Sequence, residues 1–193
     1  MMRSATVERK TAETDIRLTV ALDGAGRYEG KSGSGFFDHM LSQLAKHGGM
    51  DITLAMTGDV EVDFHHSAED AGIVLGCALD EALGDRRGVA RFADCHIPMD
   101  ECLTRAAVDL SGRGYFVWSA PAMAPAVGGL DTEIFPEFFR AFAVNAKMAL
   151  HLSVLYGANT HHMIESAFKA AARAILAAKA VAGDSLPSTK GVL

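Results

Sequence analysis

The strongest constraint on the fold is a motif that occurs twice. The pattern His-His-x-x-Glu is formed by His65, His66 and Glu69 and again by His161, His162 and Glu165. In a chain of 193 residues, two copies of a motif about half a chain length apart indicate an internal duplication. Each half is therefore expected to place the motif at the same point of the same structural unit.

The first half alternates between strand-like and helix-like periods. Residues 15–22 alternate apolar and polar side chains, which predicts a strand, and a turn follows at 23–28. Residues 36–49 have apolar side chains at helical spacing and end in a glycine pair. Residues 50–58 predict another strand, and residues 64–83 predict a helix that ends at Gly84.

The second half repeats this order. The predicted elements are strands at 104–110, 115–121 and 148–157, and helices at 136–146 and 160–181, the last ended by Gly183. Asp63 and Asn159 each lie two residues before a histidine pair, and both residue types favour the N-cap position. The histidine pairs are therefore expected in the first turn of equivalent helices.

These elements predict an α+β fold made of one domain, residues 1–193. It should be an internally duplicated two-layer α/β sandwich, each half reading strand-strand-helix-strand-helix, with the halves related by pseudo-two-fold symmetry. The repeats should span about 8–86 and 87–184. Residues 120–131 lack periodicity and predict a loose surface connection.

Composition excludes several classes of function. A formal net charge of −6 argues against a general nucleic-acid binder, which would present a basic face. No run of about 18 apolar residues predicts a membrane span, and the first 15 residues lack the apolar centre of a signal peptide. The three cysteines match no zinc spacing, so we expect reduced thiols and a cytoplasmic protein.

Histidine and glutamate at this spacing are typical of a metal site. Side chains four residues apart share a helix face, so His65 and Glu69 can bind one ion, while His66 points about 100° away. This geometry suggests two ions that take ligands from both halves, with His39 as a further ligand. Imidazole with carboxylate suits Mn, Fe, Co, Ni or Zn. The alternative is that both motifs are merely polar helix starts.

A second group of residues could bind an anion. Arg113 lies in a glycine-rich turn, Arg91 follows a predicted turn, and the C-terminal segment offers Ser188, Thr189 and Lys190. Basic and hydroxyl side chains beside free backbone amides are what a phosphate group requires, provided that these residues converge. His47, near the end of its helix, could equally cap that helix or contact a ligand or substrate.

Five segments carry these motifs: FFDHMLSQLAKHG, DFHHSAEDAGI, DLSGRGY, GANTHHMIESAFKA and PSTKGVL. In order and spacing they resemble the imidazoleglycerol-phosphate dehydratase family of histidine biosynthesis, over nearly the whole chain. The resemblance implies a hydro-lyase that converts D-erythro-imidazole glycerol phosphate to imidazole acetol phosphate. It also implies two manganese ions that bind the substrate ring as imidazolate, which can then expel the neighbouring hydroxyl.

The resemblance also implies a role for each site residue. His65, His161 and Glu165 would bind one ion, and His39, His66, Glu69 and His162 the other. Arg91, Arg113, Ser188, Thr189 and Lys190 would bind the phosphate, with the tail 185–193 contributing to the substrate site. Glu13 would lie near the reacting carbons, Gln43 and His47 in a stretch that contacts the substrate, and Lys169 in the substrate region. The hypothesis for catalysis is that Glu13 moves a proton, with His47 or a metal-bound water assisting the departing hydroxyl. Glu69 and Glu165 are also expected among the catalytic residues.

One position departs from the family pattern. Many members have a histidine where this chain has Glu137, and the internal repeat aligns Glu137 with His39. Glu137 would then replace imidazole as a ligand or ligand partner, or that ion would have one protein ligand fewer. The family assembles as a shell of twenty-four subunits with active sites at subunit interfaces. Two alternatives remain: a dinuclear metallohydrolase, and a metal-storing or metal-sensing shell.

Overall fold

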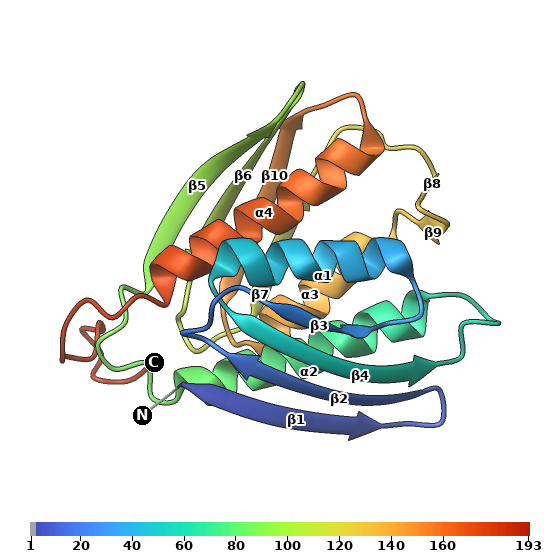
Figure 1. The fold of residues 1–193 in the computed structure, drawn as a ribbon. Coiled ribbons are helices and arrows are strands. Elements are labelled where there is room, and N and C mark those ends of the chain that lie inside the picture. The colour runs from blue at the N-terminus through green and yellow to red at the C-terminus, as the bar shows by residue number, and fades with distance from the viewer. Residues whose placement is uncertain (1–2) are drawn as a thin grey trace.

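The computed structural model describes residues 3–193 and consists of two halves with the same topology (Figure 1). The elements of the first half are β1 (Ser4–Lys10), β2 (Thr14–Ala21), β3 (Tyr28–Lys31), α1 (Gly35–Gly48), β4 (Asp51–Gly58) and α2 (His65–Leu83). Their sheet has the order β1-β2-β4-β3, in which β3 and β4 are parallel and the other pairs are antiparallel.

The second half repeats this plan with one addition. Its elements are β5 (Phe92–Met99), β6 (Cys102–Asp109), β7 (Tyr115–Ser119), β8 (Ala126–Val127), β9 (Leu130–Asp131), α3 (Ile134–Asn145), β10 (Ala149–Tyr156) and α4 (Thr160–Ala178). The sheet order β5-β6-β10-β7 matches the first sheet position by position, again with one parallel pair, β7 and β10. The small β8–β9 hairpin is the addition. The predicted duplication is confirmed.

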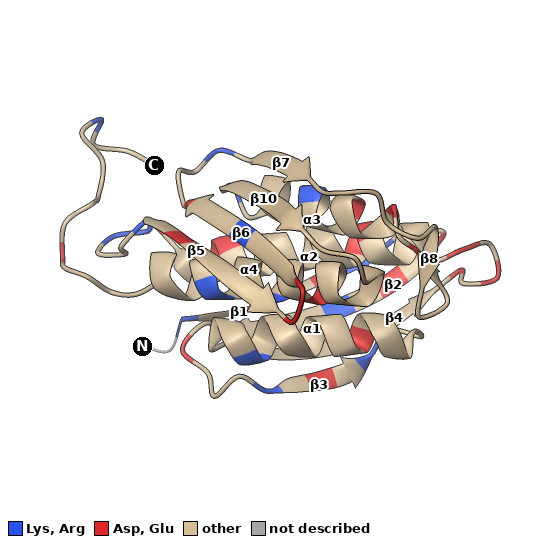
Figure 2. Cartoon of the chain, turned by 90° about the horizontal axis from the view of Figure 1, so that it is seen from above, with Lys and Arg blue, Asp and Glu red and all other residues tan. Residues whose placement is uncertain are grey.

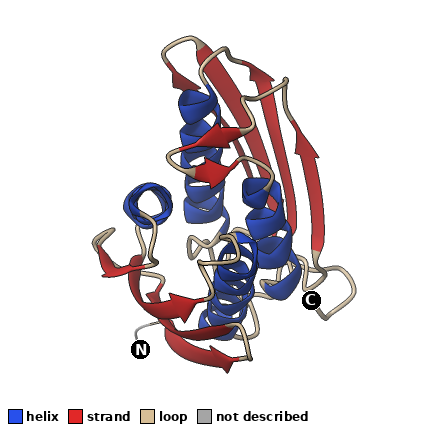
Figure 3. Cartoon of the chain, turned by 90° about the vertical axis from the view of Figure 1, so that its right-hand side faces the viewer, coloured by secondary structure: helices blue, strands red, loops and turns tan. Residues whose placement is uncertain are grey.

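The four helices lie between the two sheets, as a view from the side of the molecule shows (Figure 3). Within each half, helices pack on their own sheet: α2 covers β1 and β2, and α4 covers β5 and β6. Across the halves, α1 packs against α4 and α2 packs against α3. The pseudo-two-fold axis therefore relates the α1–α4 pair to the α3–α2 pair, and every helix that carries a motif has its closest helical neighbour in the other half.

A cluster of phenylalanines joins the halves. Phe138, Phe139 and Phe142 on α3 are fully buried, and Phe138 and Phe139 contact Phe168 on α4, with ring centroids 5.4 and 4.5 Å apart. Phe37 on α1 meets Phe138 edge-on at 5.3 Å. One continuous core thus holds helices of both halves at set spacings, so side chains at the helix starts meet in defined positions.

The contact between α2 and α3 depends on glycine. A Cβ atom at Gly76 would lie 2.6 Å from the carbonyl oxygen of Phe142 and 2.8 Å from the backbone nitrogen of Ala146. We expect Gly76→Ala to lower the free energy of unfolding by about 1–3 kcal/mol, because the backbones must separate to admit the methyl group. Urea denaturation measures this. Gly35→Ala is the control, since a Cβ there meets nothing within 4 Å; equal losses in both variants would contradict the prediction.

Several local predictions need correction. Each four-stranded sheet has one strand more than predicted: β1 and β5 were missed, and β3 begins within the segment where a turn was expected. The strands β1 and β5 are sheet edges whose side chains are only partly buried on one face, so their apolar periodicity is weak. The expected loose connection contains β8 and β9, and α4 ends at Ala178, three residues early.

The helix starts agree more closely with prediction. Asn159 is the N-cap of α4, and its side chain accepts hydrogen bonds from the backbone N–H groups of His161 and His162. The N-cap of α2 is Phe64 rather than Asp63, although Asp63 Oδ1 accepts from the backbone N–H of His65 at 2.7 Å. Both histidine pairs thus lie in the first turn of equivalent helices. Among the described residues, no helix is long and apolar enough to cross a membrane.

Candidate metal centre

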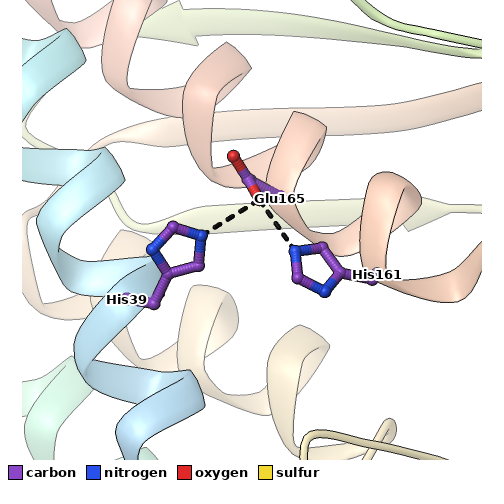
Figure 4. Close-up of side chains that lie close together, drawn as sticks. All are labelled: His39, His161 and Glu165. Atoms are coloured by element: carbon purple, nitrogen blue, oxygen red, sulfur yellow. Dashed lines mark hydrogen bonds and ion pairs between the residues drawn. The ribbon is translucent and has the colours of Figure 1, made fainter.

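Three of the predicted ligands converge between α1 and α4 (Figure 4). His39 Nε2 lies 3.1 Å from Glu165 Oε2, and His161 Nε2 lies 2.9 Å from the same oxygen. In residues 3–193 these three form a group whose ligand atoms all lie within 4.8 Å of one another. Two imidazole nitrogens facing one carboxylate oxygen form a donor set that suits a divalent transition metal.

Glu165 is the electrostatic centre of this group. Its residue surface is 5% exposed, and its Oε1 pairs with Lys169 Nζ at 2.6 Å. Burial by itself would raise the pKa of this carboxyl, but the hydrogen bonds from Lys169, His161 and His39 outweigh it and hold the pKa at about 2. Glu165 is therefore ionised near neutral pH, as a metal ligand must be.

Further polar side chains continue along α1 at helical spacing. Gln43 contacts His39 Nδ1 at 3.5 Å through its Nε2, and its Oε1 lies 3.1 Å from His47 Nε2. Burial, together with the charges of Lys169 and Arg173, lowers the pKa of His47. The imidazole of His47 is thus largely neutral at pH 7, which favours a proton-accepting role over a proton-donating one. His39, Gln43 and His47 form one line on α1, facing α4.

The other motif residues of the chain lie apart from this group. His65 lines a hollow of about 450 Å³ between the start of α1 and the β8–β9 hairpin. His66 Nδ1 lies 3.0 Å from Asp59 Oδ2 and 3.8 Å from Glu13 Oε2. His162 Nδ1 lies 2.7 Å from Glu101 Oε2. The structure therefore places His39 beside His161 and Glu165. The family resemblance instead assigns His39 to one ion and the other two residues to the second ion.

The pseudo-symmetric counterpart of the metal group lies between α2 and α3. There Arg140 bridges two carboxylates: its Nη2 lies 2.7 Å from Glu69 Oε1 and its Nε lies 2.7 Å from Glu137 Oε2. Glu137 occupies the position that His39 has in the other half. In this chain the Glu137 carboxylate is therefore an ion-pair partner of Arg140, which links it to Glu69.

The predicted phosphate residues gather at the opposite end of α4. Arg91 forms two hydrogen bonds to Asp109, at 2.8 and 3.4 Å, and donates to the carbonyl oxygen of Pro187 at 2.7 Å. A Cβ atom at Gly112, in the turn that holds Arg113, would lie 2.3 Å from the carbonyl carbon of Leu193. The C-terminal tail thus packs against both arginine segments. Within the tail, Ser188 Oγ accepts from the backbone N–H of Lys190 at 3.2 Å.

The metal group and the tail are far apart within one chain. The backbone N–H of Arg91 bonds to the carbonyl of Ala178, the last residue of α4, whereas His161 lies in its first turn. At 1.5 Å per residue these ends are roughly 26 Å apart. Lys169 belongs with the metal group rather than with the tail, because it pairs with Glu165.

Sequence reasoning missed two carboxylates, Asp59 and Glu101, which contact the second histidine of each pair. Glu101 carries a detectable signal: it directly precedes β6, as Glu13 directly precedes β2. Its Oε2 accepts from His162 and its Oε1 from the backbone N–H groups of Asn159 and Ala158, and these bonds hold its pKa at about 2. The acidic turn between β5 and β6 that carries Glu101 is visible in Figure 2.

Comparison with known proteins agrees with these features. Residues 32–175 match the family model for imidazoleglycerol-phosphate dehydratase. Relatives of that name from Cereibacter sphaeroides and Granulibacter bethesdensis are 51% and 52% identical, with full coverage of both chains in each comparison.

Two solved structures have the same fold. The crystal structure of imidazoleglycerol-phosphate dehydratase from Staphylococcus aureus has a TM-score of 0.84 and 36% identity, over 92% of this chain and 99% of that one. The structure of the enzyme from Pyrococcus furiosus, in complex with (S)-C348, has a TM-score of 0.84 and 33% identity, over 97% and 100%. The chain therefore belongs to the imidazoleglycerol-phosphate dehydratase family.

Proposed function

We propose that this hydro-lyase of histidine biosynthesis dehydrates imidazole glycerol phosphate to imidazole acetol phosphate with two manganese ions per active site. The observation that carries the metal requirement is the group formed by His39, His161 and Glu165, with ligand atoms within 4.8 Å of one another. The ions would supply Lewis acidity that stabilises the substrate ring as imidazolate. Besides these three residues, His65, His66, Glu69 and His162 are the proposed ligands.

The protein residues would control the protons of the reaction. The substrate loses a hydroxyl from the carbon next to the ring and a proton from the carbon beyond it, so one water leaves and an enol forms, which becomes the ketone. Glu13, whose carboxylate lies 3.8 Å from His66 and is about half exposed, would take the carbon-bound proton. His47, largely neutral, would share in this proton transfer. Lys169 would contact the substrate beside Glu165.

The phosphate group would be bound by Arg91, Arg113, Ser188, Thr189 and Lys190. Because this region lies at the far end of α4 from the metal group, we propose that one active site combines residues of different subunits. That division supports a homo-oligomer with sites at subunit interfaces, and the shell of twenty-four subunits is the assembly we propose. The tail 185–193 would then complete a neighbour's site.

Metal removal gives the direct test. Purified protein loaded with manganese should convert imidazole glycerol phosphate to an enolisable ketone, detected by its ultraviolet absorbance in alkali. Activity should disappear with chelator and return with added manganese, because the substrate ring needs the ions to become imidazolate.

Each alternative function predicts a different result. Release of inorganic phosphate or ammonia instead of ketone would identify a metallohydrolase. A metal-storing shell would keep its metal content and its function in Arg113→Ala and Lys190→Ala, whereas the dehydratase should bind its substrate more weakly in both variants.

A further inference from the structure

The second histidine of each pair is held by a carboxylate from outside its own helix. His66 Nδ1 lies 3.0 Å from Asp59 Oδ2, in the connection between β4 and α2. His162 Nδ1 lies 2.7 Å from Glu101 Oε2, in the turn between β5 and β6. In both histidines the same ring nitrogen, Nδ1, makes the contact. The opposite nitrogen, Nε2, is in neither residue hydrogen-bonded within residues 3–193; in His162 it lies 3.8 Å from Asp100 Oδ2, so Nε2 is the nitrogen available to bind a ligand.

The carboxylate of Glu101 has little freedom to rotate. Its Oε1 accepts hydrogen bonds from the backbone N–H groups of Ala158 at 3.1 Å and Asn159 at 2.7 Å. Its Oε2 is thereby directed at His162. One carboxylate thus connects the start of α4 to the ring of His162 and fixes the orientation of both.

A carboxylate contact at Nδ1 selects the useful form of the imidazole. An ionised carboxylate only accepts hydrogen bonds, so in a neutral ring Nδ1 carries the proton and Nε2 keeps its lone pair. Metal-binding histidines commonly donate their second ring nitrogen to a carboxylate, which fixes the tautomer and raises the basicity of the ligand atom. His66 and His162 both have this arrangement.

Duplication of the chain alone does not explain these two contacts. Glu101 directly precedes β6 as Glu13 directly precedes β2, so these two glutamates are equivalent in the repeat. In the second half, Glu101 makes the close contact with His162. In the first half Glu13 stays 3.8 Å from His66, and Asp59 makes the close contact instead. The two halves reach the same hydrogen bond from different positions in the chain.

We propose that Asp59 and Glu101 are positioning residues that orient His66 and His162 so that each presents Nε2 to a metal ion. Because Asp59 holds His66, the Glu13 carboxylate is left free for proton transfer. In the second half Glu101, the counterpart of Glu13, itself holds the histidine. This inference rests on the proposed manganese-dependent function. Asp59 and Glu101 would act on the metal ligands His66 and His162, without contacting the substrate.

Isosteric amide variants test the proposal. In Glu101→Gln, the backbone donors of Ala158 and Asn159 require the amide oxygen, so the NH2 group faces Nδ1 of His162 and favours the wrong tautomer. In Asp59→Asn, His66 loses its charged acceptor. Each variant should bind Mn(II) 10–100-fold more weakly, the usual cost of losing such a partner. Saturating Mn(II) should restore most of the dehydratase activity.

The measurement is Mn(II) titration of the assembled protein, with free Mn(II) read by electron paramagnetic resonance. The control is Glu81→Gln, which changes an exposed carboxylate near the far end of α2 and should bind Mn(II) like the wild type. Because Glu101 also anchors the start of α4, circular dichroism checks folding, and Asp59→Asn tests the proposal where Glu101→Gln does not fold.

The outcomes separate the inference from the proposed function. If the wild type binds Mn(II) and dehydrates its substrate but both amide variants bind Mn(II) as the control does, the positioning role is wrong and the function stands. Activity lost at unchanged Mn(II) affinity also overturns the positioning role. A wild type that neither binds Mn(II) nor forms the ketone overturns both.

Discussion

Replacement of Glu165 by glutamine is expected to weaken Mn(II) binding and lower kcat/KM by at least about 10²-fold. Loss of a mere partner of a metal ligand costs 10–100-fold, and Glu165 is proposed as a ligand itself. Its carboxylate is the single acceptor shared by His39, His161 and Lys169. A neutral amide at this position offers weaker coordination and leaves Lys169 without its counter-charge.

The measurements are Mn(II) titration and steady-state kinetics, with urea denaturation for stability. We expect the free energy of unfolding of Glu165→Gln to fall by roughly 1–3 kcal/mol, because a buried hydrogen-bonding network loses its charged centre. Lys169→Met is the matched comparison: it removes the same ion pair but keeps the carboxylate. Mn(II) affinity should hold or rise in Lys169→Met, since a nearby positive charge is gone. A parallel loss of affinity in both variants would mean that the ion pair, not the carboxylate, matters for metal binding.

Replacement of Glu13 by glutamine should lower kcat by about 10²–10⁴-fold, the usual contribution of a general acid or base. The expected change in Mn(II) affinity is small, because Asp59, not Glu13, makes the close contact with His66. Stability should also be nearly unchanged, since the Glu13 side chain is about half exposed. Steady-state kinetics and Mn(II) titration of the same preparation measure both effects.

Glu8→Gln is the control for this variant. Glu8 is an exposed glutamate on β1 whose ion pair with Arg17 lies on the sheet surface, so its loss should leave turnover intact. Glu13→Gln protein that turns over normally would remove Glu13 from proton transfer. Weakened Mn(II) binding in Glu13→Gln would instead place Glu13 among the metal ligands.

Much of the fold could be predicted from the spacing of residues along the chain. The helices α1, α2 and α4 have strong helical periods with a glycine or an N-cap residue at one end, and their starts fall within one residue of the predicted positions. The strands β1 and β5 could not be found in the same way. They are edge strands with exposed and half-buried side chains in alternation, and β5 contains Pro98, which is tolerated at an edge.

The residue types of the candidate site were also evident from the sequence, but not their grouping. Two copies of the motif, His39 and the Ser188-Thr189-Lys190 segment are visible as patterns. That His39 meets Glu165 follows from the packing of α1 on α4 across the two halves, a contact between residues 126 positions apart. Asp59 and Glu101 form no motif with the histidines they hold, so only their positions in space reveal them.

The duplication, the helix starts and the donor atoms available for metal binding can be inferred from the chain alone, because they depend on residue type and on spacing within one element. Which donors meet depends on how the helices pack. The packing of α1 against α4 and of α2 against α3 across the halves places an imidazole beside Glu165 but a guanidinium beside Glu69. It also separates the tail from the metal group by the length of α4, which no local pattern encodes.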